Sequence, residues 1–221
     1  MKRFLFAVLA AAVCLSACTE TKDILYRGSM FGTMLETGVM LGDDGCTYHF
    51  TNLAKLSPAM PSEGRVVATF DVFSLIEGTK TEYEAEVLYY EVPVCKDPVV
   101  CNDAMEEAEL GTDPVEMQDG SYMAGYLNLL CAAMLRYDSE VVHRINLQVV
   151  PGENADTLHT ILRHNAGEDK VTEDNSGLYS ETPFYACFPL GDYLPDGKSV
   201  VLEIKWFWKD EWQYAYGKIS K

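Results

Sequence analysis

The feature that most constrains the fold of this chain is a two-residue alternation of side-chain types. Residues 144–149 alternate strictly between polar and apolar side chains, and residues 65–73 and 82–92 place β-branched or aromatic side chains on one face. Successive side chains point to opposite faces of a strand, whereas an amphipathic helix repeats every 3.6 residues. Helical patterns are almost absent, so we predict an all-β protein.

The first half of the chain predicts a small barrel. Residues 38–41 and 46–50 have strand patterns, and Gly42-Asp43-Asp44-Gly45 between them has the composition of a hairpin turn. Together with the two longer strands, this pattern predicts about five strands within residues 27–95. We interpret them as an OB-like β-barrel domain.

The second half of the chain predicts a sandwich over residues 121–221. Short strands separated by turns, with little helix, are typical of two packed sheets. Besides residues 144–149, the expected strands are residues 158–164, 184–190, 200–208 and 212–219.

Residues 96–120 differ from both halves. They hold eight acidic residues, and Lys96 is the only base. Asp103 followed by Glu106 predicts a capped helix over residues 103–110. The remainder is expected to be a linker or a long excursion between strands. A calcium site in this acidic run is a weaker alternative, because the regular spacing of a calcium loop is missing.

The N-terminus predicts export and lipid anchoring. Lys2 and Arg3 precede an apolar stretch over residues 4–15, which is the arrangement of a signal peptide. Leu15-Ser16-Ala17-Cys18 resembles a bacterial lipobox, in which the cysteine is lipidated after cleavage. We therefore expect a signal peptide at residues 1–17, lipidation of Cys18 and a tether over residues 18–26. An ordinary signal peptide with an accidental Cys18 is the alternative.

Short motifs follow one another in a recognisable order. They are the lipobox at 15–18, the turn at 43–45, the strand entry at 64–66, and residues 125–128, 143–147 and 162–165. This order resembles the NigD-like lipoproteins of Bacteroidetes, and it covers nearly all of the chain after the signal. The resemblance implies an N-terminal OB-type barrel, a C-terminal β-sandwich and an outer-membrane location, on either the periplasmic or the surface face.

The charge of the chain limits its partners. The formal net charge is −17, and loss of Lys2 and Arg3 with the signal peptide makes it −19. Such a chain should not bind nucleic acid or an anionic lipid surface through charge. We expect contact with the membrane through the lipid anchor, and an unknown envelope protein or glycan as partner.

The mature chain has five cysteines besides Cys18. Disulfides form in the oxidising envelope, and Cys95 and Cys101 are the candidate pair because they are closest in sequence. Cys131 and Cys187 lie in apolar strand patterns and are expected to be small buried side chains.

No catalytic signature occurs in the sequence. His159 and His164 are five residues apart, which places them on opposite faces of a strand, although His143 could approach either by strand pairing. Glu84 and Glu86 are expected on a wet face, where they serve solubility. We therefore predict no catalytic residues, no metal site and no cofactor.

Aromatic residues crowd the C-terminus. Trp206 and Trp208 share a face with aliphatic residues and are expected in the core, with Phe207 on the wet side. Trp212, Tyr214 and Tyr216 form one face of the last strand and are also interpreted as core. The candidate surface contacts are Phe207, Arg163 and His164.

These observations favour a non-catalytic cell-envelope lipoprotein that acts as a binding or interaction module for protein or glycan. The first alternative is a bacteriocin-associated or immunity lipoprotein, suggested by the family resemblance. The second is an accessory to glycan or peptide hydrolysis, which needs a pair of reactive side chains brought together by folding.

Overall fold

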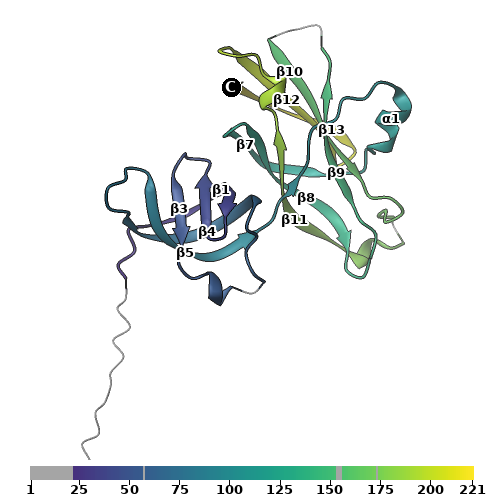
Figure 1. The fold of residues 1–221 in the computed structure, drawn as a ribbon. Coiled ribbons are helices and arrows are strands. Elements are labelled where there is room, and N and C mark those ends of the chain that lie inside the picture. The colour runs from purple at the N-terminus through teal and green to yellow at the C-terminus, as the bar shows by residue number, and fades with distance from the viewer. Residues whose placement is uncertain (1–21, 57, 153–155, 173) are drawn as a thin grey trace, which may run out of the picture.

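The computed structural model describes residues 22–56, 58–152, 156–172 and 174–221 (Figure 1). Cys18, the predicted lipidation site, lies outside them. None of the helices in these ranges is long and apolar enough to cross a membrane. The elements are β1 (Tyr26–Glu36), β2 (Val39–Gly42), β3 (Thr47–Phe50), β4 (Gly64–Leu75), β5 (Glu82–Glu91), β6 (Val94–Cys95), α1 (Ala104–Glu109), β7 (Glu116–Met123), β8 (Tyr126–Arg136), β9 (Arg144–Val150), β10 (Thr157–Asn165), β11 (Tyr179–Pro189), β12 (Ser199–Trp208) and β13 (Glu211–Ser220).

Strands β1 to β5 close into a barrel in the order β1-β2-β3-β5-β4. The β3–β5 pair is parallel, and the other pairs are antiparallel. The predicted hairpin turn is confirmed, because the Gly45 N–H donates to the Gly42 carbonyl at 2.9 Å and joins β2 to β3. Met40, Tyr48 and Phe70 are fully buried at the centre of the barrel.

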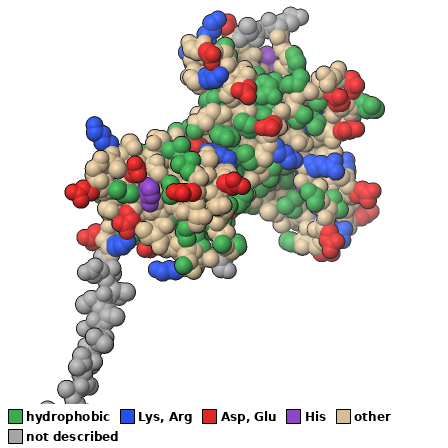
Figure 2. Space-filling model, viewed as in Figure 1, with side chains coloured by type: hydrophobic (Ala, Val, Ile, Leu, Met, Phe, Trp, Pro, Cys, Tyr) green, Lys and Arg blue, Asp and Glu red, His purple; other side chains and the backbone are tan. Residues whose placement is uncertain are grey.

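Charge is dispersed over the surface. Figure 2 shows acidic side chains scattered over the viewed face of both domains. Among residues 26–91, the bases are Arg27, Lys55, Arg65 and Lys80, and the two arginines are paired with carboxylates. Positive charge is therefore not gathered in one place on this part of the chain.

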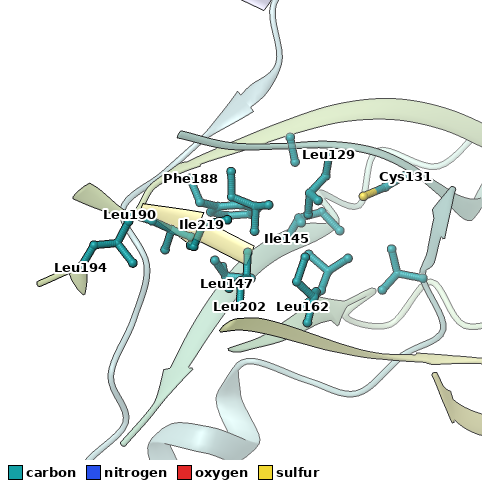
Figure 3. Close-up of a cluster of buried hydrophobic side chains, with 14 of the residues drawn as sticks. Leu129, Cys131, Ile145, Leu147, Leu162, Phe188, Leu190, Leu194, Leu202 and Ile219 are labelled. Carbon is teal, nitrogen blue, oxygen red and sulfur yellow. The ribbon is translucent and has the colours of Figure 1, made fainter. Parts of the chain in front are cut away.

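Strands β6 to β13 form two four-stranded sheets, ordered β13-β12-β10-β9 and β6-β11-β8-β7. Their inner faces enclose one apolar core, in which Leu129, Leu147 and Phe188 are fully buried (Figure 3). The predicted barrel and sandwich are thus confirmed. Each strand predicted in residues 144–219 is present, because alternation with one buried face specifies a strand strongly.

Residues 94–120 belong to the sandwich in space. β6 pairs with β11 in parallel, so the last strand of the range predicted for the barrel enters the second sheet. The predicted capped helix is confirmed as α1, with the Asp103 side chain accepting from Met105 N and Glu106 N. Val115 is buried in the sandwich core. This acidic segment is therefore an excursion that packs on the sandwich.

A buried ion pair joins the two domains. The Arg65 guanidinium, on β4, donates to both Asp43 carboxylate oxygens at 2.6 and 2.7 Å, and to the Asn128 side-chain oxygen at 2.9 Å. The Asn128 amide donates back to Asp43 at 2.7 Å. Arg65 and Asp43 come from the barrel and Asn128 from β8, so the network crosses the domain boundary.

Aromatic rings enclose this network. The Arg65 guanidinium lies 4.3 Å from the centre of the Tyr126 ring, and Phe31 meets Tyr185 edge-on with ring centres 5.5 Å apart. Phe31 is on the barrel, whereas Tyr126 and Tyr185 are on the sandwich. The rings exclude water from the ion pair, which strengthens it and raises the cost of breaking it.

Replacing Asp43 by alanine should therefore destabilise the protein by about 3–5 kcal/mol, because it leaves the Arg65 charge buried and unpaired. Urea denaturation measures this change. The control is Asp138→Ala, which removes the exposed Arg136–Asp138 pair and should cost far less, because solvent screens that pair. Equal losses of unfolding free energy in the two variants would contradict a stabilising role of this size for the Arg65–Asp43 pair.

Candidate binding site

Three aromatic side chains line the outer face of the last strand. Trp212, Tyr214 and Tyr216 are 37%, 49% and 66% exposed. The prediction that they are core is wrong, whereas Trp206 does pack against the sandwich core as expected. We call Trp212, Tyr214 and Tyr216 the aromatic row.

The turn before β13 explains the error. The strands predicted at residues 200–208 and 212–219 leave residues 209–211 for the turn, but Trp208 pairs with Glu211, so the turn has two residues. Lys209 and Asp210 have φ angles of 51° and 62°, which tight hairpin turns require. A one-residue change of register moves every side chain of a strand to the other face.

The row is flanked by polar groups from β12. Lys205 pairs with Tyr214, and its ammonium lies 4.2 Å from the centre of the Trp212 ring. Glu203 pairs with Tyr216 and lies 3.1 Å from Nδ1 of His159 on β10. The open face therefore offers ring surfaces beside an ammonium, a carboxylate and an imidazole.

The acidic excursion covers the other half of the same sheet. Val99 forms a parallel bridge with Gln148 of β9, and Glu107 of α1 forms an ion pair with Arg163 of β10. Arg163 also donates to the Gln148 side chain at 2.8 Å. Among the described residues, the outer face of β12 and β13, together with His159 near the start of β10, thus stays open.

Two of the three predicted surface contacts are wrong. Arg163 is 4% exposed because the excursion lies over it, and His164 is 2% exposed because it points to the inner side of its strand. Neither can present a surface contact. Phe207 is half-buried and meets Trp212 with ring centres 5.4 Å apart, so it borders the aromatic row.

Gly111 lets the excursion approach β10. Its φ is +76°, and a Cβ there would lie 2.5 Å from the His164 carbonyl oxygen. Two residues later, the Asp113 N–H donates to that same carbonyl at 2.9 Å. A glycine is needed here both for the backbone angle and for the space.

A pocket of about 360 Å³ lies beside the hairpin that joins β12 to β13. Trp208, Lys209 and Asp210 form one wall, and Asp113 and Lys170 are paired at 3.0 Å on another. The predicted core position of Trp208 is thus only partly right, because the residue is half-buried and lines this pocket.

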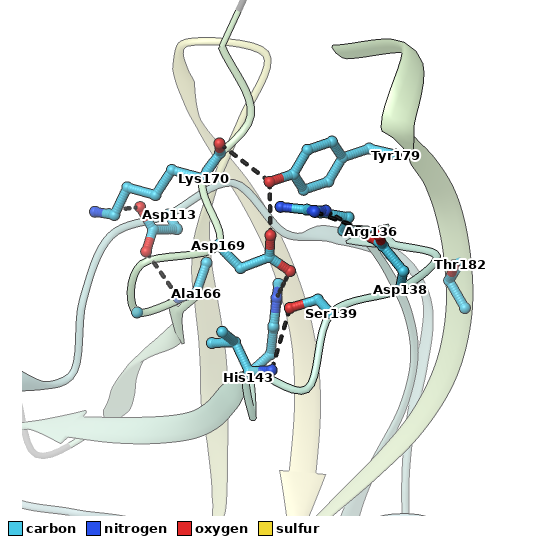
Figure 4. A network of polar contacts seen from close by, with 12 residues as sticks. Asp113, Arg136, Asp138, Ser139, His143, Ala166, Asp169, Lys170, Tyr179 and Thr182 are labelled. Atoms are coloured by element: carbon cyan, nitrogen blue, oxygen red, sulfur yellow. Dashed lines mark hydrogen bonds and ion pairs between the residues drawn. The ribbon is translucent and has the colours of Figure 1, made fainter. Parts of the chain in front are cut away.

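A chain of hydrogen bonds supports the pocket wall, and Figure 4 shows its part around His143, Asp169 and Tyr179. Nδ1 of His164 lies 2.8 Å from the Pro114 carbonyl oxygen, and its Nε2 lies 2.9 Å from Nδ1 of His143. Nε2 of His143 lies 3.2 Å from Asp169. The Tyr179 hydroxyl donates to the same carboxylate at 2.6 Å. The approach of His143 to His164 was one of the pairings left open by the sequence.

The two ends of this chain decide where its protons lie. The Pro114 carbonyl can only accept, so Nδ1 of His164 carries a hydrogen, and the other nitrogen of the neutral ring is an acceptor. Nδ1 of His143 then donates to His164, and Nε2 of His143 faces the Asp169 carboxylate at 3.2 Å.

The pKa directions agree with this assignment. Burial is the largest influence that lowers the pKa of His164, and the neighbouring His143 adds to it. Burial alone would raise the pKa of Asp169, but hydrogen bonds from Tyr179 and His143 lower it. The chain therefore contains a neutral His164 and an ionised Asp169.

Both nitrogens of His143 and His164 are engaged, so neither ring is free to accept a proton from a nucleophile. Among the described residues, no three His, Cys, Asp or Glu side chains are grouped as a metal site. Within that part of the chain, the network ties the loop after β8 to the loop after β10.

All five cysteines in the described ranges are free thiols. Cys131 and Cys187 are fully buried, as predicted. Cys95 lies opposite Cys187 on the neighbouring strand. Cys101 lies among Glu106, Glu107 and Arg163. The predicted Cys95–Cys101 disulfide stays a prediction.

The sequence alone did not reveal two parts of this site. The aromatic row could have been assigned from a two-residue turn at 209–210, because Phe207 had already been placed on the wet face. The contact between His143 and Asp169 spans 26 residues and two loops, and it has no local signal.

A family model, the NigD-like C-terminal beta sandwich domain, matches residues 98–214, more than half of the chain. The matched region begins in the acidic excursion and ends within the aromatic row. No curated protein matches the chain.

Several solved structures have the same fold. A protein from Parabacteroides distasonis ATCC 8503, provisionally named as toxin-related, has a TM-score of 0.67 and 20% identity over 88% of this chain and 94% of its own. A NigD-like immunity protein from Bacteroides caccae ATCC 43185 has a TM-score of 0.62 and 18% identity, covering 86% and 91%. A provisionally named lipoprotein from Bacteroides fragilis NCTC 9343 has a TM-score of 0.60 and 11% identity, covering 88% and 97%.

The histidine pair predicts a pH dependence of stability. Because the folded-state pKa of His164 is lowered, the unfolded chain binds that proton more tightly, so stability should fall as the pH drops below about 6.5. His164→Gln should flatten this part of the profile relative to wild type. The measurement is the denaturation midpoint between pH 8 and pH 5. Parallel profiles for the two proteins would contradict the assignment.

Proposed function

Because this chain belongs to the NigD-like family, we propose that it is a non-catalytic, lipid-anchored binding protein of the cell envelope. The observation that carries the proposal is the aromatic row on an otherwise covered sheet. Exposed aromatic rings that pack in a line beside polar groups usually mark a contact surface. The outer membrane, on either face, is the proposed location.

The ligand class that the row favours is a saccharide. Tyr214 and Tyr216 are exposed rings on which a sugar could stack, and both hydroxyls give the rings a polar end. Lys205, Glu203 and His159 stand beside them as donors and acceptors for sugar hydroxyls. The dispersed acidity of the surface disfavours an anionic partner.

A binding role also agrees with the pocket chemistry. The histidine nitrogens beside the pocket are engaged in fixed hydrogen bonds. Hydrolysis through a covalent intermediate commonly uses a serine, threonine or cysteine beside a base, and none of these three residue types is among the described residues that line the pocket. This supports the proposal of recognition over hydrolysis.

The immunity alternative rests on a neighbour named as a NigD-like immunity protein and on another provisionally named as toxin-related. No residue of this chain supports it over saccharide binding. Unchanged sensitivity of a deletion strain to toxins of sibling strains would remove it.

Replacing Tyr214 and Tyr216 together by alanine should weaken saccharide binding about tenfold, because two stacking surfaces are lost. Glycan arrays of envelope and dietary polysaccharide fragments, followed by calorimetry, measure the effect on the full chain.

Tyr89→Ala is the matched control, since Tyr89 is also an exposed strand tyrosine but lies on the barrel. Equal saccharide binding by the wild type, the double variant and Tyr89→Ala would rule out the row as the saccharide site. Capture of an envelope protein that depends on the row, with no glycan bound, would assign the surface to protein recognition.

The lipid anchor has a separate test. Cys18→Ala should release the protein from membranes, because the acyl chains that hold it would no longer be attached. Fractionation of cells and labelling with a palmitate analogue measure the anchor. Cys14→Ala, within the predicted signal peptide, is the control and should leave the protein on the membrane. Membrane retention of Cys18→Ala would contradict lipidation.

A further inference from the structure

Two cysteines face each other where the chain leaves the barrel. Cys95 of β6 and Cys187 of β11 are directly paired in a parallel ladder, and the Lys96 N–H donates to the Cys187 carbonyl at 3.3 Å. Neighbouring strands lie about 4.8 Å apart, and directly paired side chains point to the same side. A disulfide requires Cα atoms about 4.4–6.8 Å apart, so this pairing meets the requirement.

The two thiols differ in their surroundings. Cys95 is exposed, whereas Cys187 is fully buried. The two side chains lie on the same side of the ladder, and the positive charge of Arg65 favours the thiolate at both positions. An exposed thiol beside a buried thiol and a guanidinium is the arrangement of an attacking and a resolving cysteine.

The electrostatics support the same roles. The hydrogen bond from Cys187 and the Arg65 charge lower the pKa of the Cys95 thiol to about 7. The hydrogen bond to Cys95, together with burial, raises the pKa of Cys187. The first proton to leave the pair therefore leaves from the exposed sulfur.

We propose that Cys95 and Cys187 are a redox pair, which a disulfide-bearing thiol oxidoreductase of the envelope oxidises to a disulfide. The bond fastens the exit of the barrel to the second sheet of the sandwich.

The reaction balances as two thiol–disulfide exchanges. The Cys95 thiolate attacks one sulfur of the donor disulfide, the donor S–S bond breaks, and a mixed disulfide forms. The donor sulfur that leaves takes up a proton. Cys187 then loses its proton and attacks the Cys95 sulfur, which releases the second donor thiol. Two protein thiols are oxidised and one donor disulfide is reduced.

The proposed Cys95–Cys187 bond and the predicted Cys95–Cys101 disulfide are mutually exclusive, because Cys95 cannot form both bonds. Cys101 lies beside α1, where the carboxylates of Glu106 and Glu107 raise its pKa in addition to burial. That environment disfavours the thiolate, whereas the environment of Cys95 favours it. Sequence distance alone favours the Cys95–Cys101 pair, whereas strand pairing and the surroundings of the thiols favour the Cys95–Cys187 pair.

The test is made on the full chain, isolated from membranes of cells that export it. Free thiols are alkylated under denaturing conditions, and peptides are mapped by mass spectrometry without reduction. The expected result is a Cys95–Cys187 linked peptide, two hydrogens lighter than the two reduced peptides together. Both cysteines alkylated, or Cys95 linked to Cys101, would overturn the proposal.

Two variants and a rate measurement sharpen the result. Cys95→Ser should leave Cys187 alkylated, and Cys101→Ser should leave the linked peptide unchanged. On the reduced chain, alkylation of Cys95 should reach half its maximal rate near pH 7. A midpoint near pH 9 would overturn the role of Cys95 as the attacking thiol. The Cys101→Ser protein is the folding control, because its substitution is equally conservative.

Discussion

The ion pair between Arg65 and Asp43, shared with Asn128, is the interaction on which the arrangement of this protein depends. When a guanidinium and a carboxylate are both removed from water, their hydrogen-bond donors and acceptors must match in number and direction. The two domains therefore have little freedom to shift at this point. Asp43 lies in the hairpin turn of the barrel, and Asn128 lies on a central strand of the sandwich. The network therefore connects the β2–β3 turn of the barrel to a strand inside the second sheet, and the rings of Phe31, Tyr126 and Tyr185 complete the contact.

Much of the fold could be predicted because it is local. Alternation over residues 144–149 specifies β9, and the capping pattern at Asp103 and Glu106 specifies α1. The junction could not be predicted, since Arg65 and Asn128 are 63 residues apart and neither carries a distinguishing neighbour. The prediction that the aromatic row is buried was wrong for a different reason. Its face depends on one residue of turn length, and a sequence pattern does not distinguish an edge strand with an open face from one that is covered.

The acidic excursion links these observations. Its charge first indicated a linker, but its apolar members and its glycine bring it back onto the sheet. Val115 enters the core, Gly111 passes close to β10, and Glu107 neutralises Arg163. The segment therefore removes one half of the outer sheet face from solvent and leaves the other half open. The binding surface that we propose is defined by this cover as much as by the aromatic residues themselves.

That cover also gives the open face a shape. Two strands remain uncovered, a strip about 10 Å wide, and alternate side chains along a strand repeat about every 7 Å. The rings of Trp212, Tyr214 and Tyr216 thus lie along a narrow track whose direction is that of β13. A track of this outline suits a single extended polymer lying lengthwise, and the excursion over β9 and β10 bounds it on one side, whereas β13 is the open edge of the sheet. Branches that project toward the excursion would be obstructed by the geometry of the sheet, before any individual hydrogen bond is considered.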